Sequence, residues 1–285
     1  MNNSGVTLSV LQELQQKYRV TASKALGQNF LVDANISRKI AESIDPGQNV
    51  IEVGPGIGSL TVPLARRSKR VFAIEFDAYI LDPLNDVLTK FEVDNKVEIM
   101  HSDVMNVDLQ KMCEEKGVST VIGNLPYNIS APLLADIARK APAVKTVVAM
   151  VQKEVGERLA AKQGTRAVSS ITLKCQYYMD IEVVFDVPVQ SFIPRPRVDS
   201  VLISMIRRAE GNDRLNKQDA NEMFSMMDMA FSQRRKMMRQ SLKGLFASKT
   251  AEIFEKSGVA PTARPEECTL DDFVKIFNSY KVVCP

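Results

Sequence analysis

The stretch Ile51-Glu-Val-Gly-Pro-Gly-Ile-Gly-Ser-Leu-Thr61 decides the fold. Three glycines, Gly54, Gly56 and Gly58, follow a short apolar run at alternate positions. Glycine has no Cβ, so such a segment can turn tightly and its backbone can come close to a ligand. The spacing is GxGxG and differs from the GxGxxG of dinucleotide-binding folds. The stretch therefore predicts a strand that turns into a helix beside a small-molecule site.

The chain around this stretch alternates between strand-like and helix-like segments. This alternation predicts an α/β fold, with a parallel sheet and helices on both faces. Two later runs, 181–187 and 200–207, leave no room for a crossover helix between them, so we expect an antiparallel hairpin at one sheet edge. The earlier strands are expected at 49–53, 70–74, 97–101, 120–123 and 145–151. Helices are expected at 7–18, 34–44 with Asp33 as N-cap, 153–162 and 168–178.

The C-terminal part of the chain has a different pattern. Beyond Arg208, the polar stretch Glu210-Gly-Asn-Asp-Arg214 is typical of a linker, and the remainder is helical in its periodicity. We therefore expect two domains, an α/β domain over 1–208 and a small all-α domain over 209–285. Its helices are expected at 219–231, 234–247, 250–257 and 270–279.

Composition excludes several classes of protein. The 285 residues are 45% hydrophobic and 25% charged, as in a globular chain, and no apolar run is long enough to predict a membrane span. Four cysteines without a CxxC pair predict neither a disulfide framework nor a zinc site, and favour a reducing cytoplasm. The single histidine, His101, leaves no Ser-His-Asp triad and no histidine-rich metal centre. The polar N-terminus predicts no signal peptide.

Two carboxylates follow the next two predicted strands. Glu75 ends the second strand, where a carboxylate can accept hydrogen bonds from ribose hydroxyls. Asp103 follows the third strand, where it can accept from an adenine amino group. A glycine turn alone is a weak signal, but the turn, Glu75 and Asp103 in this order look like the S-adenosylmethionine site of the Rossmann-like class I methyltransferase fold. We therefore expect S-adenosyl-L-methionine as methyl donor and no metal.

The stretch Gly123-Asn-Leu-Pro-Tyr-Asn-Ile-Ser130 follows the fourth strand and resembles the Asn-Pro-Pro-Tyr-type motif of enzymes that methylate exocyclic amino groups. The Asn124 side-chain oxygen and the Leu125 carbonyl can accept both hydrogens of an adenine N6 amine and stabilise the positive charge that develops on nitrogen. Pro126 fixes the backbone so that this carbonyl points inward. Tyr127 offers a ring on which an extruded base can stack. No general base is required, because the product ammonium loses its proton to water.

Five motifs in the same order resemble the bacterial small-subunit ribosomal RNA adenine N6,N6-dimethyltransferase family, of the KsgA or RsmA type. The motifs are 25–31, 52–61, 124–130, 150–155 and 192–200. The resemblance covers almost the whole chain. It implies that the substrate is two adjacent adenosines in the loop of the 3′-terminal helix of 16S RNA, each dimethylated at N6 in a nearly assembled 30S subunit.

The resemblance also implies roles for individual residues. Asn29 and Leu31 would close over the methionine end of the cofactor, and Asn124 would bridge cofactor and target. Phe192 would supply a second stacking face opposite Tyr127. The alternative interpretation, which needs no family resemblance, is that Phe192 anchors the core at a proline-rich turn. The residues implied to bind the cofactor are Asn29, Leu31, Gly54, Gly56, Glu75, Asp103 and Asn124.

The segment 229–249 carries six basic residues and no acidic one. On one continuous helix, Arg235, Arg239 and Lys243 fall on the same face, and such a stripe can follow a phosphate backbone. A basic run is often only a solvated face, but the resemblance favours RNA. The RNA-binding residues expected are Arg234, Arg235, Lys236, Arg239, Lys243, Arg195 and Arg197.

Two alternatives stay open at the level of the sequence. One is a large-subunit ribosomal RNA adenine methyltransferase that confers antibiotic resistance, although 192–197 and 231–236 favour the small-subunit enzyme. The other is a non-catalytic ribosome-assembly or transcription factor on the same fold, against which the intact cofactor set and 124–127 argue. We expect a monomer whose partner is 16S RNA within the assembling 30S subunit, with no membrane association.

Overall fold

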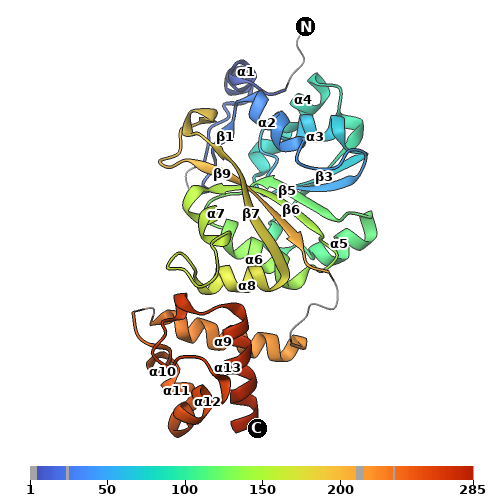
Figure 1. Ribbon diagram of the computed structural model, residues 1–285. Coiled ribbons are helices and arrows are strands. Elements are labelled where there is room, and N and C mark those ends of the chain that lie inside the picture. The colour runs from blue at the N-terminus through green and yellow to red at the C-terminus, as the bar shows by residue number, and fades with distance from the viewer. Residues whose placement is uncertain (1–4, 24–25, 210–214, 234, 285) are drawn as a thin grey trace. The chain divides into compact units, whose positions relative to one another are not determined.

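The computed structural model divides the chain into two units (Figure 1). One unit combines Met1–Gly156 with Asp180–Arg207, and the other combines Glu157–Met179 with Arg208–Pro285. No helix among the described residues is both long and apolar enough to cross a bilayer. The residues that the structure describes are 5–23, 26–209, 215–233 and 235–284.

A seven-stranded mixed sheet forms the centre of the first unit. Its strands are β2 (Asn49–Val53), β3 (Arg70–Glu75), β4 (Val97–His101), β5 (Thr120–Asn124), β6 (Thr146–Gln152), β7 (Met179–Val187) and β9 (Ser200–Arg207). They follow the order β4-β3-β2-β5-β6-β9-β7. The strands from β4 to β6 are parallel, and β9 runs antiparallel to β6. The predicted α/β fold is confirmed, with β7 and β9 as neighbours at one edge.

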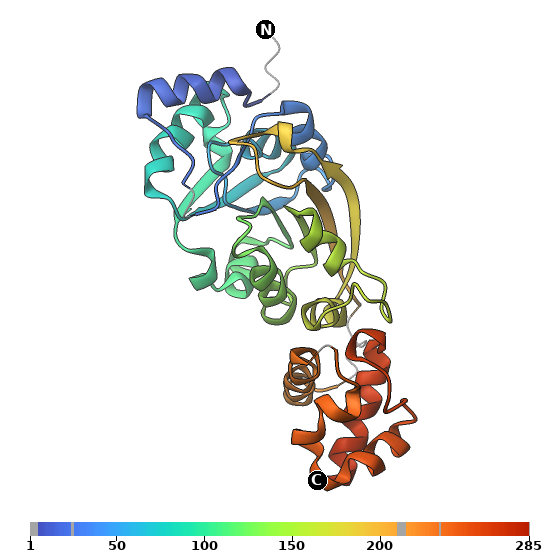
Figure 2. The same ribbon diagram turned by 90° about the vertical axis from the view of Figure 1, so that its left-hand side faces the viewer.

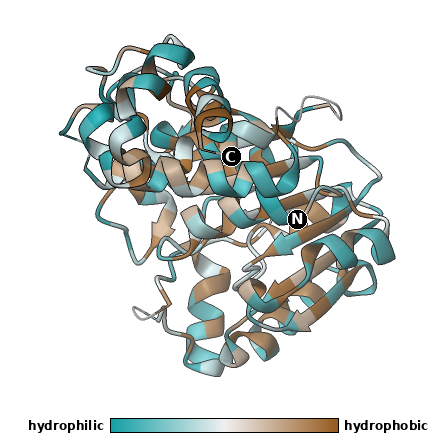
Figure 3. Cartoon of the chain, turned by 90° about the horizontal axis from the view of Figure 1, so that it is seen from below, coloured by the Kyte–Doolittle hydropathy of each residue, from teal (hydrophilic) through white to brown (hydrophobic). Residues whose placement is uncertain are grey.

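Helices cover both faces of this sheet, which is why its inner strands are apolar nearly throughout. Figures 1 and 2 show α2, α3 and α4 on one face and α5 and α6 on the other, and Figure 3 shows mainly apolar strands beside helices of mixed polarity. The prediction that Asp33 is the N-cap of α2 is confirmed, because its side chain accepts hydrogen bonds from the Asn35 and Ile36 amides. The helices are α1 (Leu8–Tyr18), α2 (Ala34–Ala41), α3 (Thr61–Arg67), α4 (Ala78–Lys90), α5 (Leu109–Lys116) and α6 (Ser130–Lys140).

A separate two-stranded sheet joins β1 (Phe30–Leu31) to β8 (Phe192–Ile193). The strands are antiparallel, and Leu31 lies opposite Phe192. Two residues are too few to show an alternating pattern, so the sequence predicted neither strand. The pairing places the 26–31 part of the first motif beside the 192–200 motif, although the two are far apart in sequence. Residue 25 of that motif lies outside the described residues.

Arg207 at the end of β9 holds the C-terminal end of α6. Its guanidinium donates to the carbonyls of Ala138 (3.0 Å), Ile137 (3.2 Å), Ala141 (3.1 Å) and Val144 (2.7 Å). Some of these carbonyls have no hydrogen-bond partner within the helix. A positive charge at the C-terminal end of a helix also interacts favourably with the helix dipole.

We therefore expect Arg207→Met to lower the free energy of unfolding by about 2 kcal/mol, because charge-assisted hydrogen bonds to these carbonyls are lost. Urea unfolding at pH 7 measures the change. The exposed Arg197→Met is the control, with an expected change below about 0.5 kcal/mol. Equal losses in the two variants would contradict the role given to Arg207.

The second unit is helical and has its own core. Helix α7 (Lys153–Leu159) begins in the first unit and ends in the second, and α8 (Ser170–Tyr178) lies wholly in the second. The remaining helices are α9 (Lys217–Ser232), α10 (Met238–Ser241), α11 (Lys243–Phe246), α12 (Thr250–Ser257) and α13 (Leu270–Val283). Short 3-10 turns are η1 (Asp94–Lys96), η2 (Val104–Asn106), η3 (Val189–Ser191), η4 (Ala247–Lys249) and η5 (Pro265–Glu267).

The division between the units differs from the predicted domain boundary. The sequence placed 157–179 in the α/β domain, but the structure places this segment in the helical unit. The reason is packing, because Leu173 and Tyr177 of α8 belong to the same buried cluster as the residues of α9 and α13. In addition, the Gln163 side chain accepts from the Leu270 amide at 3.0 Å.

The basic segment does not form the single helix that the sequence predicted over 234–247. Helix α9 ends at Ser232, and short helices begin only at Met238 and Lys243. The break lies before α10, where its N-cap Met237 is extended (φ -65°, ψ 150°), and the first two amides of α10 donate outside the helix, Met238 to Ala263 O and Arg239 to Pro261 O. The prediction of an i, i+4, i+8 stripe through 235, 239 and 243 is therefore wrong.

Candidate active site

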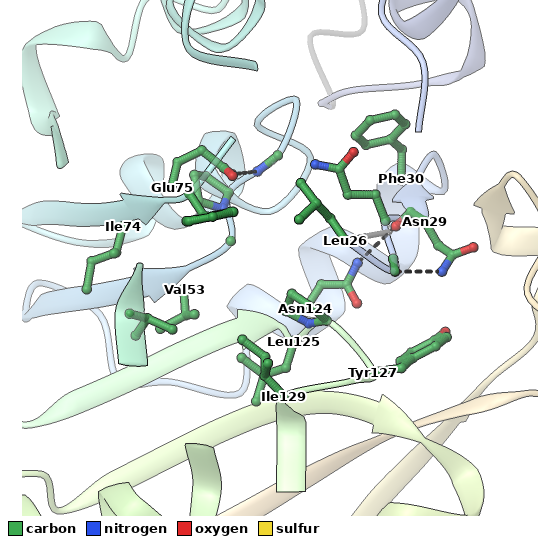
Figure 4. Close-up of a pocket in the computed structure, with 18 of the residues that line it drawn as sticks. Leu26, Asn29, Phe30, Val53, Ile74, Glu75, Asn124, Leu125, Tyr127 and Ile129 are labelled. Atoms are coloured by element: carbon green, nitrogen blue, oxygen red, sulfur yellow. Dashed lines mark hydrogen bonds between the residues drawn. The ribbon is translucent and has the colours of Figure 1, made fainter. Parts of the chain in front are cut away.

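A pocket of ≈ 250 Å³ lies at the C-terminal ends of β2, β3, β4 and β5 (Figure 4). In the sheet, β3 lies on one side of β2 and β5 lies on the other, so the strand order reverses at β2. Ligands of open α/β sheets bind at such a reversal. All the residues predicted to bind a cofactor line this pocket, as does the Asn-Leu-Pro-Tyr turn. They are Asn29, Leu31, Gly54, Gly56, Glu75, Asp103, Asn124, Leu125, Pro126 and Tyr127.

The glycine turn leaves open space that a side chain would fill. Gly54 has φ +69° and Gly56 has φ +53°, the left-handed region that favours glycine. A Cβ on Gly54 would come 3.7 Å from the Asn124 carbonyl oxygen, and one on Gly56 would come 3.7 Å from the Phe30 ring. Both positions therefore keep the backbone accessible at the floor of the pocket.

Glu75 is a buried carboxylate held in one orientation. Its Oε2 accepts from the Gly56 amide at 3.0 Å, and its Oε1 accepts from the Asp77 amide at 2.8 Å. Burial raises the pKa of Glu75, and the bonds from the Asp77 and Gly56 amides oppose that rise. Each carboxylate oxygen has a further lone pair, so the group can still accept a hydrogen bond from a ligand.

One wall residue was missed by sequence reasoning. The Phe76 ring lines the pocket and is 56% exposed, although a phenylalanine is usually buried. The signal available in the sequence was its position directly after Glu75, at the end of a strand. Asp103 also lines the pocket, and its Oδ1 accepts from the Met105 amide at 2.9 Å. An open ring beside two carboxylates suits a flat, polar heterocycle.

Asn124 lies at the centre of the site, with Glu75 on one side and Tyr127 on the other in Figure 4. Its Nδ2 donates to the Asn29 carbonyl at 3.2 Å, and the Asn29 side chain donates to the Gly27 carbonyl at 3.1 Å. Because Nδ2 is turned toward this carbonyl, Oδ1, the acceptor of the amide, faces away from it and stays available to a ligand. The 124 side chain and the 26–31 segment therefore hold one another in place.

The 26–31 segment has a second attachment, to the N-cap of α4. Gln28 Nε2 donates to Asp77 Oδ2 at 2.8 Å, while Asp77 also caps α4 by accepting from the Tyr79 amide. Sequence reasoning identified neither Gln28 nor Asp77, which are separated by 49 positions. The segment is thus bonded both to the end of β5 and to the start of α4.

Tyr127 and Phe192, the two predicted stacking residues, have different surroundings. Tyr127 lines the pocket, and its hydroxyl is hydrogen-bonded to Ser200 Oγ at 2.9 Å. Phe192 is fully buried in the core and is not part of the pocket wall. Its side chain therefore takes the position of a core anchor in this structure, and a stacking role for Phe192 stays a prediction.

The predicted RNA-binding residues fall in two places. Arg195 and Arg197 are exposed on the loop between β8 and β9 of the first unit. Those of the second unit that the structure describes are also exposed, namely Arg235, Lys236, Arg239 and Lys243. Arg234 lies outside the described residues. Within the described part of the chain, no group of three histidine, cysteine or acidic side chains is arranged to hold a metal ion.

Glu52, directly before the glycine turn, is a buried carboxyl beneath the site. It is 1% exposed, and its Oε2 has no hydrogen-bond partner. Burial raises the pKa of Glu52 from 4.5 to about 8, and the Glu75 charge adds to the rise. The folded protein therefore holds a proton here at pH values where the unfolded chain has lost it.

This proton makes stability depend on pH. Between pH 4.5 and about 8 the folded state binds the proton more tightly than the unfolded state, so stability should fall as pH rises through this window. We expect Glu52→Gln to reduce that fall, by at most about 1.4 kcal/mol per pH unit. Urea unfolding at pH 5.5 and pH 8 measures it, with the exposed Glu255→Gln as control. An unchanged pH slope in Glu52→Gln would refute the assignment.

A mixed seven-stranded sheet, a glycine turn and strand-end carboxylates around an Asn-Leu-Pro-Tyr turn define a Rossmann-like methyltransferase. The family model described as ribosomal RNA adenine dimethylase matches residues 19–281. The chain belongs to this ribosomal RNA adenine dimethylase family.

Individual relatives agree with this assignment. The ribosomal RNA small subunit methyltransferase A of Staphylococcus carnosus is 36% identical, over 94% of this chain and 93% of its own. The protein of the same name from a Geobacillus species is 34% identical over 99% of this chain and its whole length. A dimethyladenosine transferase from Plasmodium falciparum has a TM-score of 0.73 at 25% identity, covering 88% of this chain and 98% of its own. The 23S rRNA methyltransferase ErmE has a TM-score of 0.66 at 24% identity, covering 89% and 100%, which shows the shared fold.

Proposed function

We propose that the protein transfers methyl groups from S-adenosyl-L-methionine to N6 of two adjacent adenosines in the 3′-terminal helix loop of 16S RNA, dimethylating each, during small-subunit biogenesis. The observation that carries this proposal is Asn124, whose Nδ2 is held by Asn29 so that its Oδ1 remains an acceptor in the pocket. The full-length relatives named small subunit methyltransferase A support the small-subunit substrate. They give less support to the antibiotic-resistance alternative.

The donor set of the pocket fits this cofactor. Gly54 and Gly56, which have positive φ and no side chain, leave room for the cofactor close to the backbone. Glu75 offers carboxylate oxygens to the two hydroxyls of the cofactor's ribose. Phe76 and Asp103 offer a flat face and an acceptor for the adenine. When bound, S-adenosylmethionine supplies a methyl group already activated by its sulfonium sulfur.

The residues of this chain then act on the target amine. Asn124 Oδ1 and the Leu125 carbonyl accept the two N6 hydrogens, which favours a pyramidal nitrogen and stabilises its developing positive charge. Tyr127 stacks on the extruded base and orients it. The proton leaves to water after transfer, so the site needs no histidine. In the second transfer the monomethylated amine has a single N6 hydrogen, which one of these two acceptors receives.

The cellular setting is part of the proposal. We place the enzyme in the cytoplasm as a monomer, acting on 16S RNA within the assembling 30S subunit. The free cysteines support a reducing compartment, because Cys113, Cys175 and Cys268 are buried as unpaired thiols.

The test is to map methyl groups on ribosomal subunits. Small and large subunits from a strain that lacks its own dimethyltransferase are incubated with the protein and methyl-labelled S-adenosylmethionine, and the RNA is analysed by mass spectrometry. Four methyl groups on two adjacent adenosines of 16S RNA are expected. Label in large-subunit RNA alone would support the resistance-type alternative, and no label with intact cofactor binding would support the non-catalytic factor.

The RNA surface of the second unit has its own prediction. Arg239 and Lys243 are exposed on consecutive short helices, whereas Lys249 is paired with Glu252 at 3.0 Å. We expect Arg239→Ala combined with Lys243→Ala to weaken binding to undermethylated small subunits by about 10-fold or more, and to lower the salt dependence by roughly 0.7–0.9 per lost phosphate contact. Filter binding at several salt concentrations measures both quantities. Lys249→Ala is the matched control, and an equal loss in it would indicate a nonspecific charge effect.

A further inference from the structure

We propose that Ser200 is a positioning residue for methyl transfer, because its buried hydroxyl holds the Tyr127 ring at the angle that the target base needs. This inference rests on the proposed function of the site. Ser200 lies outside the pocket wall and is separated from Tyr127 by 73 positions.

The contact between the two hydroxyl groups is well defined. Tyr127 Oη and Ser200 Oγ are 2.9 Å apart, and either atom can be the donor. Tyr127 lines the pocket, but Ser200 is fully buried. Tyr127 is part-buried, and a phenolic hydroxyl with restricted access to water needs a partner, since leaving it without one costs part of its desolvation energy. Burial also raises the pKa of Tyr127, so the phenol stays neutral and keeps its proton for this bond.

Ser200 is itself held firmly. It is the first residue of β9 and lies opposite Gln152 of β6. The preceding residue, Asp199, accepts from the Lys153 amide through its carbonyl at 2.9 Å and from the Val189 amide through its carboxylate at 3.0 Å. Ser200 is therefore fixed by its place in the sheet and by the hydrogen bonds of the residue before it.

Tyr127, in contrast, lies on the turn between β5 and α6. Its backbone carbonyl accepts from Ser130 Oγ at 3.3 Å, and its ring is fixed at the far end by the bond to Ser200. Without that bond the ring gains freedom about its side-chain torsions. A stacked base would then share this freedom, and the amine would spend less time in line with the methyl group.

The experiment combines single-turnover kinetics with a double-mutant cycle. The variants are Ser200→Ala, Tyr127→Phe and the double variant, assayed on undermethylated small subunits. Ser204→Ala is the matched control, because it lies on the same strand and is not part of the site. Each single variant is expected to lower the transfer rate about 10-fold, which is the size that one hydrogen bond supports, with KM for RNA and Kd for S-adenosylmethionine within about twofold.

The double variant decides whether the residues act together. If Ser200 acts only through Tyr127, the double variant loses no more than either single variant. Losses that multiply to about 100-fold, or an unchanged rate in Ser200→Ala, would overturn the proposal. A Ser200→Ala protein that loses cofactor affinity and thermal stability together with rate would show a structural role instead. An inactive wild-type protein would count against the proposed function.

A measurement that needs no activity tests the contact itself. In protein with carbon-13 at the tyrosine ring, six tyrosines give signals, and the one that disappears in Tyr127→Phe is assigned. In Ser200→Ala this signal alone is expected to shift and broaden, while Ser204→Ala leaves it unchanged. An unchanged Tyr127 signal in Ser200→Ala would overturn the proposal whatever the substrate of the enzyme is.

Discussion

Asn124→Ala is expected to lower the rate of methyl transfer by roughly 10³-fold while S-adenosylmethionine still binds with an affinity within about 10-fold. The variant removes an acceptor from the place where charge develops, and single groups of this kind are worth about 10²–10³ in rate. Cofactor binding survives because Asn124 is one of many groups that line the pocket. Rapid mixing with labelled cofactor measures the rate, and calorimetry measures the affinity.

A second variant at the same position separates the role of the oxygen from that of the amide. Asn124→Asp keeps an acceptor but loses the Nδ2 donor to the Asn29 carbonyl. We expect it to retain at least about 10 times more activity than Asn124→Ala. Full activity in Asn124→Ala, or equal losses in the two variants, would contradict the role given to Oδ1.

Glu75→Ala is expected to weaken binding of S-adenosylmethionine by about 100-fold. The variant removes the carboxylate proposed for the ribose, and charge-assisted hydrogen bonds of this kind are worth about 1.5–3 kcal/mol. It also leaves the Gly56 and Asp77 amides without their acceptor, so the glycine turn loses support. Calorimetry with the cofactor measures the affinity, and circular dichroism checks the fold.

The controls for Glu75 distinguish charge from shape. Asp82→Ala, on the exposed side of α4, should leave the affinity unchanged. Because burial raises the pKa of Glu75, cofactor binding should also weaken on acidification earlier than for an exposed glutamate. An affinity in Glu75→Ala that matches the wild type would remove Glu75 from the cofactor site.

Much of the fold could be predicted because its signals are local. The apolar runs at 49–53, 70–74 and 120–123 became parallel strands, since a sheet covered on both faces needs apolar residues at every position. Pairings between distant segments could not be predicted in this way. The β1–β8 sheet consists of two-residue strands, and the membership of 157–179 depends on which core buries Leu173 and Tyr177.

The candidate site shows the same division. Glu75, Asp103 and Asn124 follow strands directly, so their place at one sheet edge followed from the strand order. The bonds of Gln28 to Asp77 and of Tyr127 to Ser200 join distant segments and have no local pattern. The expected basic stripe failed for a related reason, because the backbone is extended at Met237 and α10 begins against the distant 261–263 backbone.

The helical unit is built from two separate segments of the chain, and this has a consequence for synthesis on the ribosome. Residues 157–179 leave the exit tunnel about a hundred residues before α13, whose core they share. During that interval Leu173 and Tyr177 have no final partner, and strand β9 must still insert between β6 and β7. The nascent chain therefore carries an incomplete helical core until α13 has been made, and a fragment that starts at 209 would lack part of that core permanently.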